Sequence, residues 1–423
     1  MGGAKPGYRH YVLAVLLAGY VLNAFDRSIL NLLLEPIRQE FGLSDTQLGL
    51  LSGVAFALFY STVAIPVAAL ADRWSRRNVL ALSVLLWTVM TALCGVAGSF
   101  GALLLARIGV GIGEAGCNPP SHSLLADYFP PKQRATALGV YALGAPLGAM
   151  LTGLAGGWGS EHLGWRGTML LAGAPGLLLV PLLFLTVSEP ARPATRPRAH
   201  DSAPGLRDAL SSMWSLPTFR NLCLASALHS FAMYASSSFN PAYLTRSHGW
   251  TGGEIGQLIA MTGFAGIAGT LLGGIVTDRL GARGDEPRWQ LWIPGMATFL
   301  VVPVQLVVYL GSGATMVAAV LLSSLLSLVF FGPSYATAQA LAEPRMRAMA
   351  AAMLLFSKAL IGMGLGPLVV GMLSDRLAPL AGEDSLRYSL LLAPLFNLWA
   401  GMHFLLAARH LRQDLRGIAA TTP

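Results

Sequence analysis

Five ionisable residues lie inside segments that are otherwise apolar: Asp26, Arg27, Arg107, Glu114 and Lys358. A charge at the centre of a bilayer costs at least about 2.5 kcal/mol, and such residues mark ion or substrate pathways. Four of the five fall in only two segments, as Asp26-Arg27 and as Arg107 with Glu114. An opposite charge lowers the pKa of a carboxyl group and burial raises it, so this arrangement of acids and bases predicts a functional pathway within the membrane.

The polar residues of the fourth apolar segment recur at helical spacing. Arg107, Gly111, Glu114 and Asn118 are separated by four, three and four positions, which places them on one face of a helix. Arg107 and Glu114 then lie about 10 Å apart along the helix axis. The first segment has a matching polar stripe that begins at Asn23. A purely structural ion-pair network is the alternative, and even then these charges must face the protein interior.

The chain as a whole is far more apolar than a soluble protein. Of its 423 residues, 54% are hydrophobic and 11% are charged, and the mean hydropathy is +0.59. Soluble domains carry about 25% charged residues. Apolar runs of about 20 residues, such as 79–96 and 170–187, predict bilayer-spanning helices. Residues 11–34 lack a small-residue cleavage site and carry two charges, so they predict a retained first span and not a signal peptide.

The sequence contains no pattern for catalysis or metal binding. The three cysteines, Cys94, Cys117 and Cys223, fall in predicted spans and have neither disulfide nor metal spacing. There is no phosphate-binding loop and no nucleophile arrangement. We therefore expect no enzyme activity, no metal and no cofactor.

The apolar segments predict an all-α membrane protein with twelve transmembrane helices. Residues 1–188 form one six-helix bundle, 189–217 a cytoplasmic linker, and 218–423 a second six-helix bundle. The linker is rich in Pro, Arg and Ala, and it includes a short amphipathic helix near 206–214 that can lie on the membrane surface. We place the spans at 9–34, 46–71, 79–98, 101–127, 133–158, 166–188, 220–245, 253–277, 290–311, 314–341, 347–373 and 387–408.

Basic residues are distributed unevenly between the two sides of the membrane. Of the 28 lysines and arginines, three lie in spans and 20 on the cytoplasmic side, which leaves five outside: Arg38, Arg166, Arg246, Arg376 and Arg387. The positive-inside rule then predicts that both termini are cytoplasmic. The distribution also explains the net charge of +8 without a nucleic-acid partner. We expect a monomer in a bacterial inner membrane, whose partners are the lipid bilayer and a small-molecule or lipid substrate.

The two halves of the sequence repeat each other. Pro120-Ser121 recurs as Pro333-Ser334 after 213 positions, and Asp72-Arg73 recurs as Asp278-Arg279 after 206. Repeats of equal orientation with a binding site between them are typical of transporters.

Two short segments, 68–77 and 274–283, connect predicted spans two to three and eight to nine. Both resemble the cytoplasmic loop motifs of the major facilitator superfamily, although Ala68 and Ser75 stand where glycine is common. An Asp at a helix end can accept hydrogen bonds from the amides of a neighbouring helix and can pair with Arg, and such contacts can close one side of a transporter. The alternative is that the basic residues only fix the topology. The predicted gating residues are Asp72, Arg73, Arg76, Arg77, Asp278, Arg279 and Arg283.

A finer resemblance is to the spinster family within that superfamily. The segments that carry it are 23–27, 107–115, 119–121 and 126–129. The resemblance implies a proton-coupled carrier in which Asp26 and Glu114 are protonation sites, with Arg27 and Arg107 as their partners or as anion anchors. Eukaryotic members of the family are linked to lysolipids and sphingoid phosphates.

The second half adds aromatic surface and one further charge. Phe331 and Tyr335 in span ten, with Tyr234 and Asn240 in span seven, predict a wall that suits an amphiphile with an anionic head, although membrane bundles are aromatic in any case. Lys358 is either a substrate contact or lies closer to the cytoplasmic end of its span. The predicted substrate site also includes Asn23, Asn118, Arg27 and Arg107.

We therefore predict a proton-coupled secondary active transporter that works by alternating access. Its expected substrate is an amphipathic anion such as a lysolipid or a sphingoid phosphate. A carrier of small organic anions such as sugar acids or carboxylates, or a drug efflux pump, is the alternative. A non-transporting membrane receptor is the third hypothesis.

Overall fold

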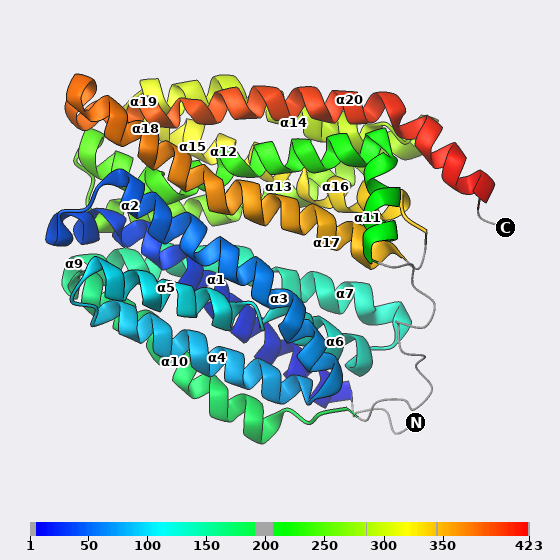
Figure 1. Ribbon diagram of the computed structural model, residues 1–423, viewed down its shortest axis with the longest axis horizontal. Helices are drawn as coiled ribbons and strands as arrows, with labels where there is room; N and C mark the ends of the chain where they lie inside the picture. The colour runs from blue at the N-terminus through cyan, green and yellow to red at the C-terminus, as the bar shows by residue number, and fades with distance from the viewer. Residues whose placement is uncertain (1–5, 191–205, 285, 344–345, 422–423) are drawn as a thin grey trace. The chain divides into compact units, whose positions relative to one another are not determined.

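The computed structural model describes residues 6–190, 206–284, 286–343 and 346–421. Within these ranges the chain is built from helices and short connections, and no strand is present. Figure 1 shows long helices running side by side within each part of the chain. The predicted all-α class is confirmed.

The first half of the chain contains ten α-helices and two short π-helical segments. They are α1 (Pro6–Phe41), α2 (Asp45–Gly49), η1 (Leu50–Val54), α3 (Ala55–Arg73), α4 (Arg76–Gly95), α5 (Phe100–Glu114), α6 (Asn118–Tyr128), α7 (Pro131–Ala142), α8 (Gly144–Leu151), η2 (Thr152–Gly156), α9 (Gly157–His162) and α10 (Gly164–Thr186).

The second half begins with the short helix α11, where the sequence predicts an amphipathic helix. Its elements are α11 (Leu206–Ser215), α12 (Pro217–His248), α13 (Gly252–Gly284), α14 (Trp289–Leu310), α15 (Gly313–Leu328), α16 (Phe331–Ala340), α17 (Arg347–Ser357), η4 (Lys358–Leu365), α18 (Gly366–Ala381), η5 (Gly382–Asp384), α19 (Ser385–Leu390) and α20 (Leu392–Thr421). Residues 191–205 of the predicted linker lie outside the described ranges.

Ten helical stretches in the described ranges are long and apolar enough to cross a membrane by length and composition. One of them, Met349–Ile418, covers the last two predicted spans. The predicted seventh span, α12, is not among the ten. This helix carries Arg220, His229 and the serines at 236–238, which lower its hydropathy although it is 32 residues long.

The chain folds into two compact units that divide two of its helices. The first unit contains residues 1–192 and 238–264, and the second contains residues 193–237 and 265–423. Helices α12 and α13 therefore each contribute residues to both units. The predicted bundles, 1–188 and 218–423, remain a prediction. Residues 238–264, from the end of α12 into α13, belong to the compact unit that contains residues 1–192.

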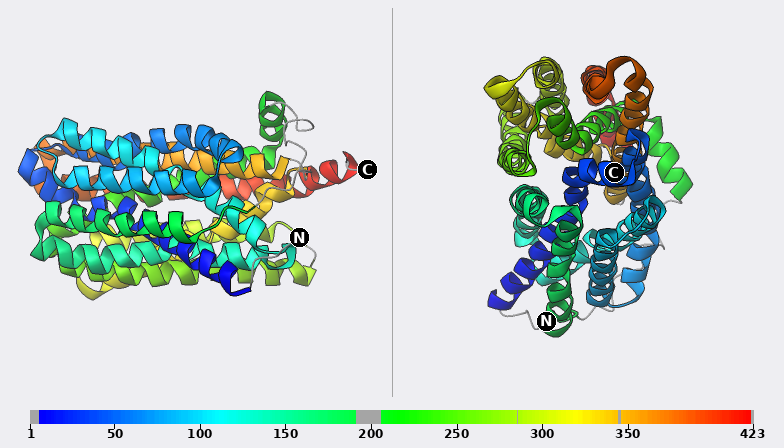
Figure 2. Two further views of the ribbon diagram at one scale, coloured as in Figure 1. Left: turned by 90° about the horizontal axis from the view of Figure 1, so that it is seen from below. Right: turned by 90° about the vertical axis from the view of Figure 1, so that its left-hand side faces the viewer.

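Glycines in α5 bring this helix into close contact with its neighbours in the first unit. A Cβ atom on Gly113 would lie 2.6 Å from the backbone N of Trp87 in α4, and one on Gly111 would lie 2.9 Å from the carbonyl O of Phe56 in α3. Both helices pack against α5, and α4 also packs against α10. Figure 2 shows these helices from two further directions. Close packing fixes the face of α5 that carries Arg107 and Glu114.

Serine caps fix where the key helices begin. Ser75 accepts a hydrogen bond from the backbone N–H of Asn78 at the start of α4, and Ser99 accepts one from Ala102 at the start of α5. Such caps satisfy amides that have no partner within the helix. Each start therefore has a local sequence cause.

Candidate functional site

Helices α1 and α5 bring the predicted proton-coupling residues into one buried cluster. The guanidinium of Arg27 donates to the Glu114 carboxylate, with Nη2 and Nε at 2.9 and 3.1 Å from the same oxygen, Oε2. Arg27 Nη2 also donates to Oδ1 of Asn23, one turn away on α1, at 3.0 Å. This ion pair joins residues that are 87 positions apart in the sequence.

Aromatic rings from α3 cover the positive charges of this cluster. The Arg27 guanidinium lies 5.2 Å from the ring centroid of Phe56 and 4.9 Å from that of Tyr60. The Arg107 guanidinium lies 5.4 Å from the same Phe56 ring. The Glu114 side chain is fully buried, whereas 25% of the Arg27 side chain is exposed. The exposed side of this pair is therefore the arginine side.

Asp26 has a different partner from the one the sequence suggested. Its Oδ2 accepts a short hydrogen bond from the Thr91 hydroxyl of α4. Arg107 is buried and forms no ion pair with Asp26 or Glu114. In this structure its guanidinium lies against the Phe56 ring, and its role as a partner of the acids or as an anion anchor stays a prediction.

Several polar atoms of the cluster are buried without a hydrogen-bond partner in the described structure: Asn23 Nδ2, Asp26 Oδ1, Arg107 Nε and Glu114 Oε1. A buried polar atom without a partner costs about 1–3 kcal/mol, and more when it belongs to a charged group. Four such atoms in one cluster indicate a site that is completed by a proton, by water or by a polar ligand.

Asn118 lies at the start of α6 and has its own partner. Its Oδ1 accepts a hydrogen bond from the Tyr141 hydroxyl at 2.9 Å, and the Tyr141 ring stacks on that of Tyr20 at 4.8 Å. Asn118 therefore holds α7 and α6 together beside the cluster.

The second unit holds Lys358 together with two of the predicted substrate residues, Phe331 and Tyr335. The Lys358 ammonium lies 4.3 Å from the ring centroid of Phe331 and 5.1 Å from that of Tyr335. Tyr234 belongs to the second unit and Asn240 to the first, although both are on α12. The three aromatic residues of the predicted wall therefore belong to the second unit, and Asn240 does not.

The first predicted gating loop contains a buried ion-pair network. Arg76 is almost fully buried, and its guanidinium donates to Glu189 Oε1 at 2.7 Å and to Asp127. The backbone N–H of Arg77 donates to Glu189 Oε2 at 3.0 Å. Arg73 is exposed, and the side chain of Asp72 lies outside the described part of the structure. Arg76 therefore joins α4 to α6 and to the segment after α10, a role that the sequence analysis did not assign.

Glu189 provides a pH-dependent test of this network. Burial by itself raises the pKa of Glu189, but hydrogen bonds from the Arg77 amide and the Arg76 guanidinium outweigh it and hold this pKa below its usual value. The charged form thus stabilises the folded state above the unfolded pKa of about 4.3, and this contribution is lost as the pH falls through the lower folded pKa. We expect Glu189→Gln to lower the unfolding temperature at pH 7, by an amount that shrinks below about pH 4.

Scanning fluorimetry of the detergent-purified protein between pH 3.5 and 8 measures this difference. Glu383→Gln is the control, since Glu383 is exposed and lies on η5 far along the chain from the network. A Glu189→Gln deficit that is equal at both ends of the pH range contradicts the assignment.

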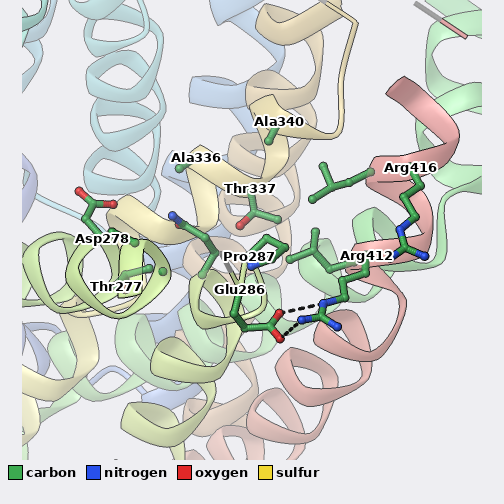
Figure 3. A pocket seen from close by; sticks show the side chains of 14 residues that line it. Thr277, Asp278, Glu286, Pro287, Ala336, Thr337, Ala340, Arg412 and Arg416 are labelled. Carbon is green, nitrogen blue, oxygen red and sulfur yellow. Dashed lines mark hydrogen bonds and ion pairs between the residues drawn. The ribbon is translucent and has the colours of Figure 1, made fainter. Parts of the chain in front are cut away.

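The second predicted gating loop borders an open cavity of about 850 Å³ in the second unit. Asp278 and Arg416 lie at opposite sides of its lining, and Glu286 is paired with Arg412 between them (Figure 3). Hydrogen bonds from Arg288 lower the pKa of Glu286 to about 2. Asp278, Arg279 and Arg283 are exposed, so their predicted gating role stays a prediction.

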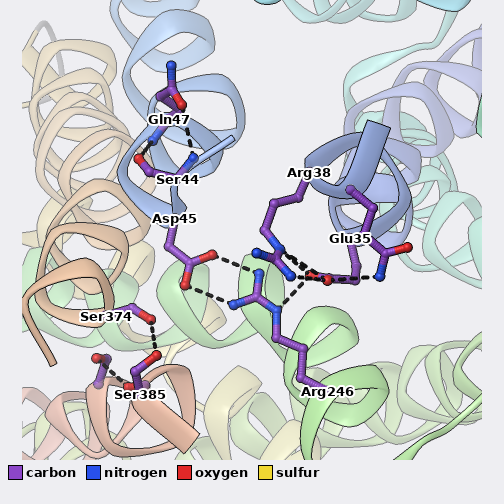
Figure 4. Close-up of polar contacts among 10 residues, drawn as sticks. Glu35, Arg38, Ser44, Asp45, Gln47, Arg246, Ser374 and Ser385 are labelled. Carbon is purple, nitrogen blue, oxygen red and sulfur yellow. Dashed lines mark hydrogen bonds and ion pairs between the residues drawn. The ribbon is translucent and has the colours of Figure 1, made fainter. Parts of the chain in front are cut away.

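The sequence analysis missed a second buried ion cluster in the first unit. Arg246 near the end of α12 donates from Nε to Glu35 Oε2 at 2.6 Å, and from Nη2 and Nη1 to the two oxygens of Asp45 at 2.7 and 2.9 Å. Arg38 also donates to Glu35, at 2.8 Å (Figure 4). Glu35 and Asp45 are both more than nine-tenths buried. No local pattern identifies these residues, because each lies at the end of an apolar segment where charges are common.

Comparison with known proteins decides the family. The model of the Major Facilitator Superfamily matches residues 16–367 and 222–419. The chain belongs to this superfamily. An "MFS-type efflux pump" of Mycolicibacterium smegmatis is 36% identical over 400 residues, which cover 93% of this chain and 91% of that protein. A "Probable galactarate/D-glucarate transporter" of Bacillus subtilis is 26% identical over 79% of this chain and 77% of its own length.

A solved structure confirms the finer resemblance. It is a bacterial homologue of the human lysosomal transporter Spinster, in an inward-facing and unoccupied conformation. That chain is 32% identical to this one with a TM-score of 0.85, and the match covers 97% of this chain and 99% of that chain. The protein is therefore a multi-pass membrane transporter of the major facilitator fold with a spinster-like sequence, and not an enzyme.

Proposed function

We propose that the protein is a proton-coupled secondary active transporter that works by alternating access, with an amphipathic anion as its substrate. The observation that carries the proposal is the Arg27–Glu114 ion pair, in which the acid is fully buried and the base is partly exposed. This arrangement presents a positive charge to a ligand while a protonatable group stands behind it.

The geometry suggests how a proton and an anion can be linked. Protonation of Glu114 weakens its attraction for Arg27, because the carboxyl group loses the negative charge that faces the guanidinium. The freed guanidinium can then bind a carboxylate or phosphate, for which its planar donors are well suited. Asp26 supplies a second carboxyl group, and its unpartnered Oδ1 is free to take a proton. If the proton and the anionic substrate bind together, the transporter is a symporter. If the binding of one excludes the other, it is an antiporter.

The Arg246 cluster suggests how one side of the transporter closes. It joins α12 to the end of α1 and the start of α2, and Glu35 lies eight residues after Arg27 on α1. Under the positive-inside rule this end of the helices faces away from the cytoplasm, and both termini face the cytoplasm of a bacterial cell. Contacts that hold one side shut in one state must break in the other, and an ion cluster with a few discrete contacts can do so.

The alternative substrate is a small organic anion, and the galactarate/D-glucarate transporter among the relatives supports it. The relative that is named an MFS-type efflux pump supports export as a further alternative, for which drug efflux is our hypothesis. Both alternatives use the same fold, so only the substrate distinguishes them.

Uptake into proteoliposomes tests the proposal and the alternatives together. The full chain is reconstituted, a pH step is imposed, and uptake of labelled lysophosphatidic acid, D-glucarate and ethidium is compared with that of protein-free liposomes. We expect pH-driven uptake of lysophosphatidic acid to be at least tenfold above that of D-glucarate. The reverse order supports the small-anion carrier, transport of ethidium alone supports efflux, and uptake that ignores the pH step rejects proton coupling.

A further inference from the structure

Lys358 is a buried cation in the second unit without an acidic partner. It is the first residue of the π-helical segment η4, and only 6% of its surface is exposed. Among the described residues no carboxylate lies within ion-pair distance of its ammonium, and no hydrogen bond to it is formed. By contrast, the buried Arg76 and Arg246 each contact two carboxylates.

Three aromatic rings surround the ammonium group. Its Nζ lies 4.8, 4.3 and 5.1 Å from the ring centroids of Phe330, Phe331 and Tyr335. Aromatic faces attract a cation, but they replace only part of the hydration that a buried ammonium loses. The ammonium has three N–H donors, and a ring face is a weaker acceptor for them than an oxygen atom.

The buried histidine near Lys358, His229, already has hydrogen-bond partners. The His229 ring packs on Phe330 at 4.6 Å, and its two nitrogens face the Ser327 carbonyl and Asn397 Oδ1 at 2.8 and 2.7 Å. Asn397 in turn donates to Gln305 at 2.8 Å. This network holds His229 and Phe330 in place beside the lysine and offers no negative charge to the ammonium.

We propose that Lys358 and its three aromatic neighbours form an anion-binding site in the second unit, which takes the phosphate or carboxylate group of the transported molecule. The proposal rests on the proposed function and adds the residue that recognises the charged group. Phe331 is 42% exposed, so it offers an apolar surface for the part of the ligand beyond that group. A π-helical segment at this position is consistent with a binding role, since such segments occur frequently at functional sites.

Binding measurements with matched ligands test the site. The probes are lysophosphatidic acid with monoacylglycerol of the same chain as its neutral counterpart, and D-glucarate with glucose. Purified full-length wild type, Lys358→Met, Lys358→Gln and Lys358→Arg are compared by thermal shift and by equilibrium binding. The two anions distinguish a lipid headgroup from a free acid as the source of the negative charge.

We expect the affinity for the bound anion to fall at least tenfold in Lys358→Met and Lys358→Gln, to recover in part in Lys358→Arg, and to stay unchanged for the neutral probes. We also expect ligand-free Lys358→Met to unfold at a higher temperature than wild type, because an uncompensated buried charge is removed. A merely structural lysine predicts the opposite, with a lower unfolding temperature and unchanged affinity.

The outcomes separate this site from the proposed function. Anion affinity that is unchanged in Lys358→Met and Lys358→Gln overturns the site, even if the pH-driven uptake of the wild type persists. Wild type that binds neither anion also overturns it. Uptake that ignores the pH step, with anion affinity still dependent on Lys358, rejects proton coupling and leaves the anion site standing.

Discussion

Replacing Glu114 with glutamine should reduce pH-driven transport at least tenfold while the protein remains folded. Glutamine keeps the size of glutamate and can still accept a hydrogen bond from Arg27, but it cannot bind or release a proton. The hydrogen bond also loses its charge on the acceptor, and bonds to charged groups contribute about 1.5–3 kcal/mol. The expected reduction follows from the loss of the protonatable group, because proton uptake at this position can no longer drive transport.

The decisive measurement compares two kinds of flux in the same proteoliposomes. Uptake driven by a pH step should disappear in Glu114→Gln, whereas exchange of labelled for unlabelled substrate at equal pH should persist, because exchange needs no net proton movement. Glu383→Gln, an exposed acid outside the cluster, should match wild type in both measurements. Full pH-driven flux in Glu114→Gln would falsify its role as the coupling group.

Asp26→Asn separates the two acids of the cluster in the same assay. If Glu114 alone carries the proton, Asp26→Asn keeps pH-driven uptake. If pH-driven uptake is lost in Asp26→Asn, Asp26 on α1 is a second protonation site. The structure makes the comparison informative because Asp26 contacts Thr91 and not an arginine within ion-pair distance.

Much of this cluster could be predicted because a buried charge in an apolar segment is conspicuous. Asp26, Arg27, Arg107 and Glu114 share two helices, and helical spacing fixes which of them lie on one face. The choice of partners could not be predicted in this way. Whether Arg27 or Arg107 meets Glu114 depends on the rotation and depth of α5 against α1 and α3. Close contacts at Gly111 and Gly113 set both.

Ion pairs at the ends of helices could not be recognised from the sequence. Glu35 and Asp45 lie 211 and 201 positions before Arg246, and Glu189 lies 113 positions after Arg76. Charges are common at the ends of spans, where each serves equally well as a topology anchor. The repeat of loop motifs directed attention to Arg76 itself, but its partners come from the ends of α6 and α10.

Replacing Arg246 with alanine should destabilise the protein by about 3–5 kcal/mol, the usual effect of removing one partner from a buried ion pair. Glu35 keeps its contact with Arg38, but Asp45 loses both hydrogen bonds to Arg246 and remains more than nine-tenths buried. Scanning fluorimetry should show a clearly lower unfolding temperature. Hydrogen exchange of the amides at 249–256 should rise, because Arg246 fixes the end of α12 to the first unit.

Arg38→Ala is the matched control for this prediction. Arg38 also pairs with Glu35, but 36% of its side chain is exposed and the pair joins neighbouring turns of α1. Exposed pairs contribute about 0–1 kcal/mol, so the two arginine variants should differ severalfold in their effect on stability. Arg246→Lys should be intermediate, because an ammonium keeps the charge and cannot make both bonds to Asp45 in the fork geometry of a guanidinium.

A double variant separates the effect of the Arg246–Asp45 ion pair on stability from its effect on transport. Arg246→Met combined with Asp45→Leu removes both charges of the bidentate pair, and replacement of a whole buried pair by apolar residues is often neutral or stabilising. We expect this double variant to recover much of the unfolding temperature lost in Arg246→Ala, yet to transport more slowly than wild type. The reason is that this variant stays folded but lacks the ion cluster that we propose closes the side facing away from the cytoplasm. Equal stability with unchanged transport in the double variant shows instead that the cluster only holds the helices together.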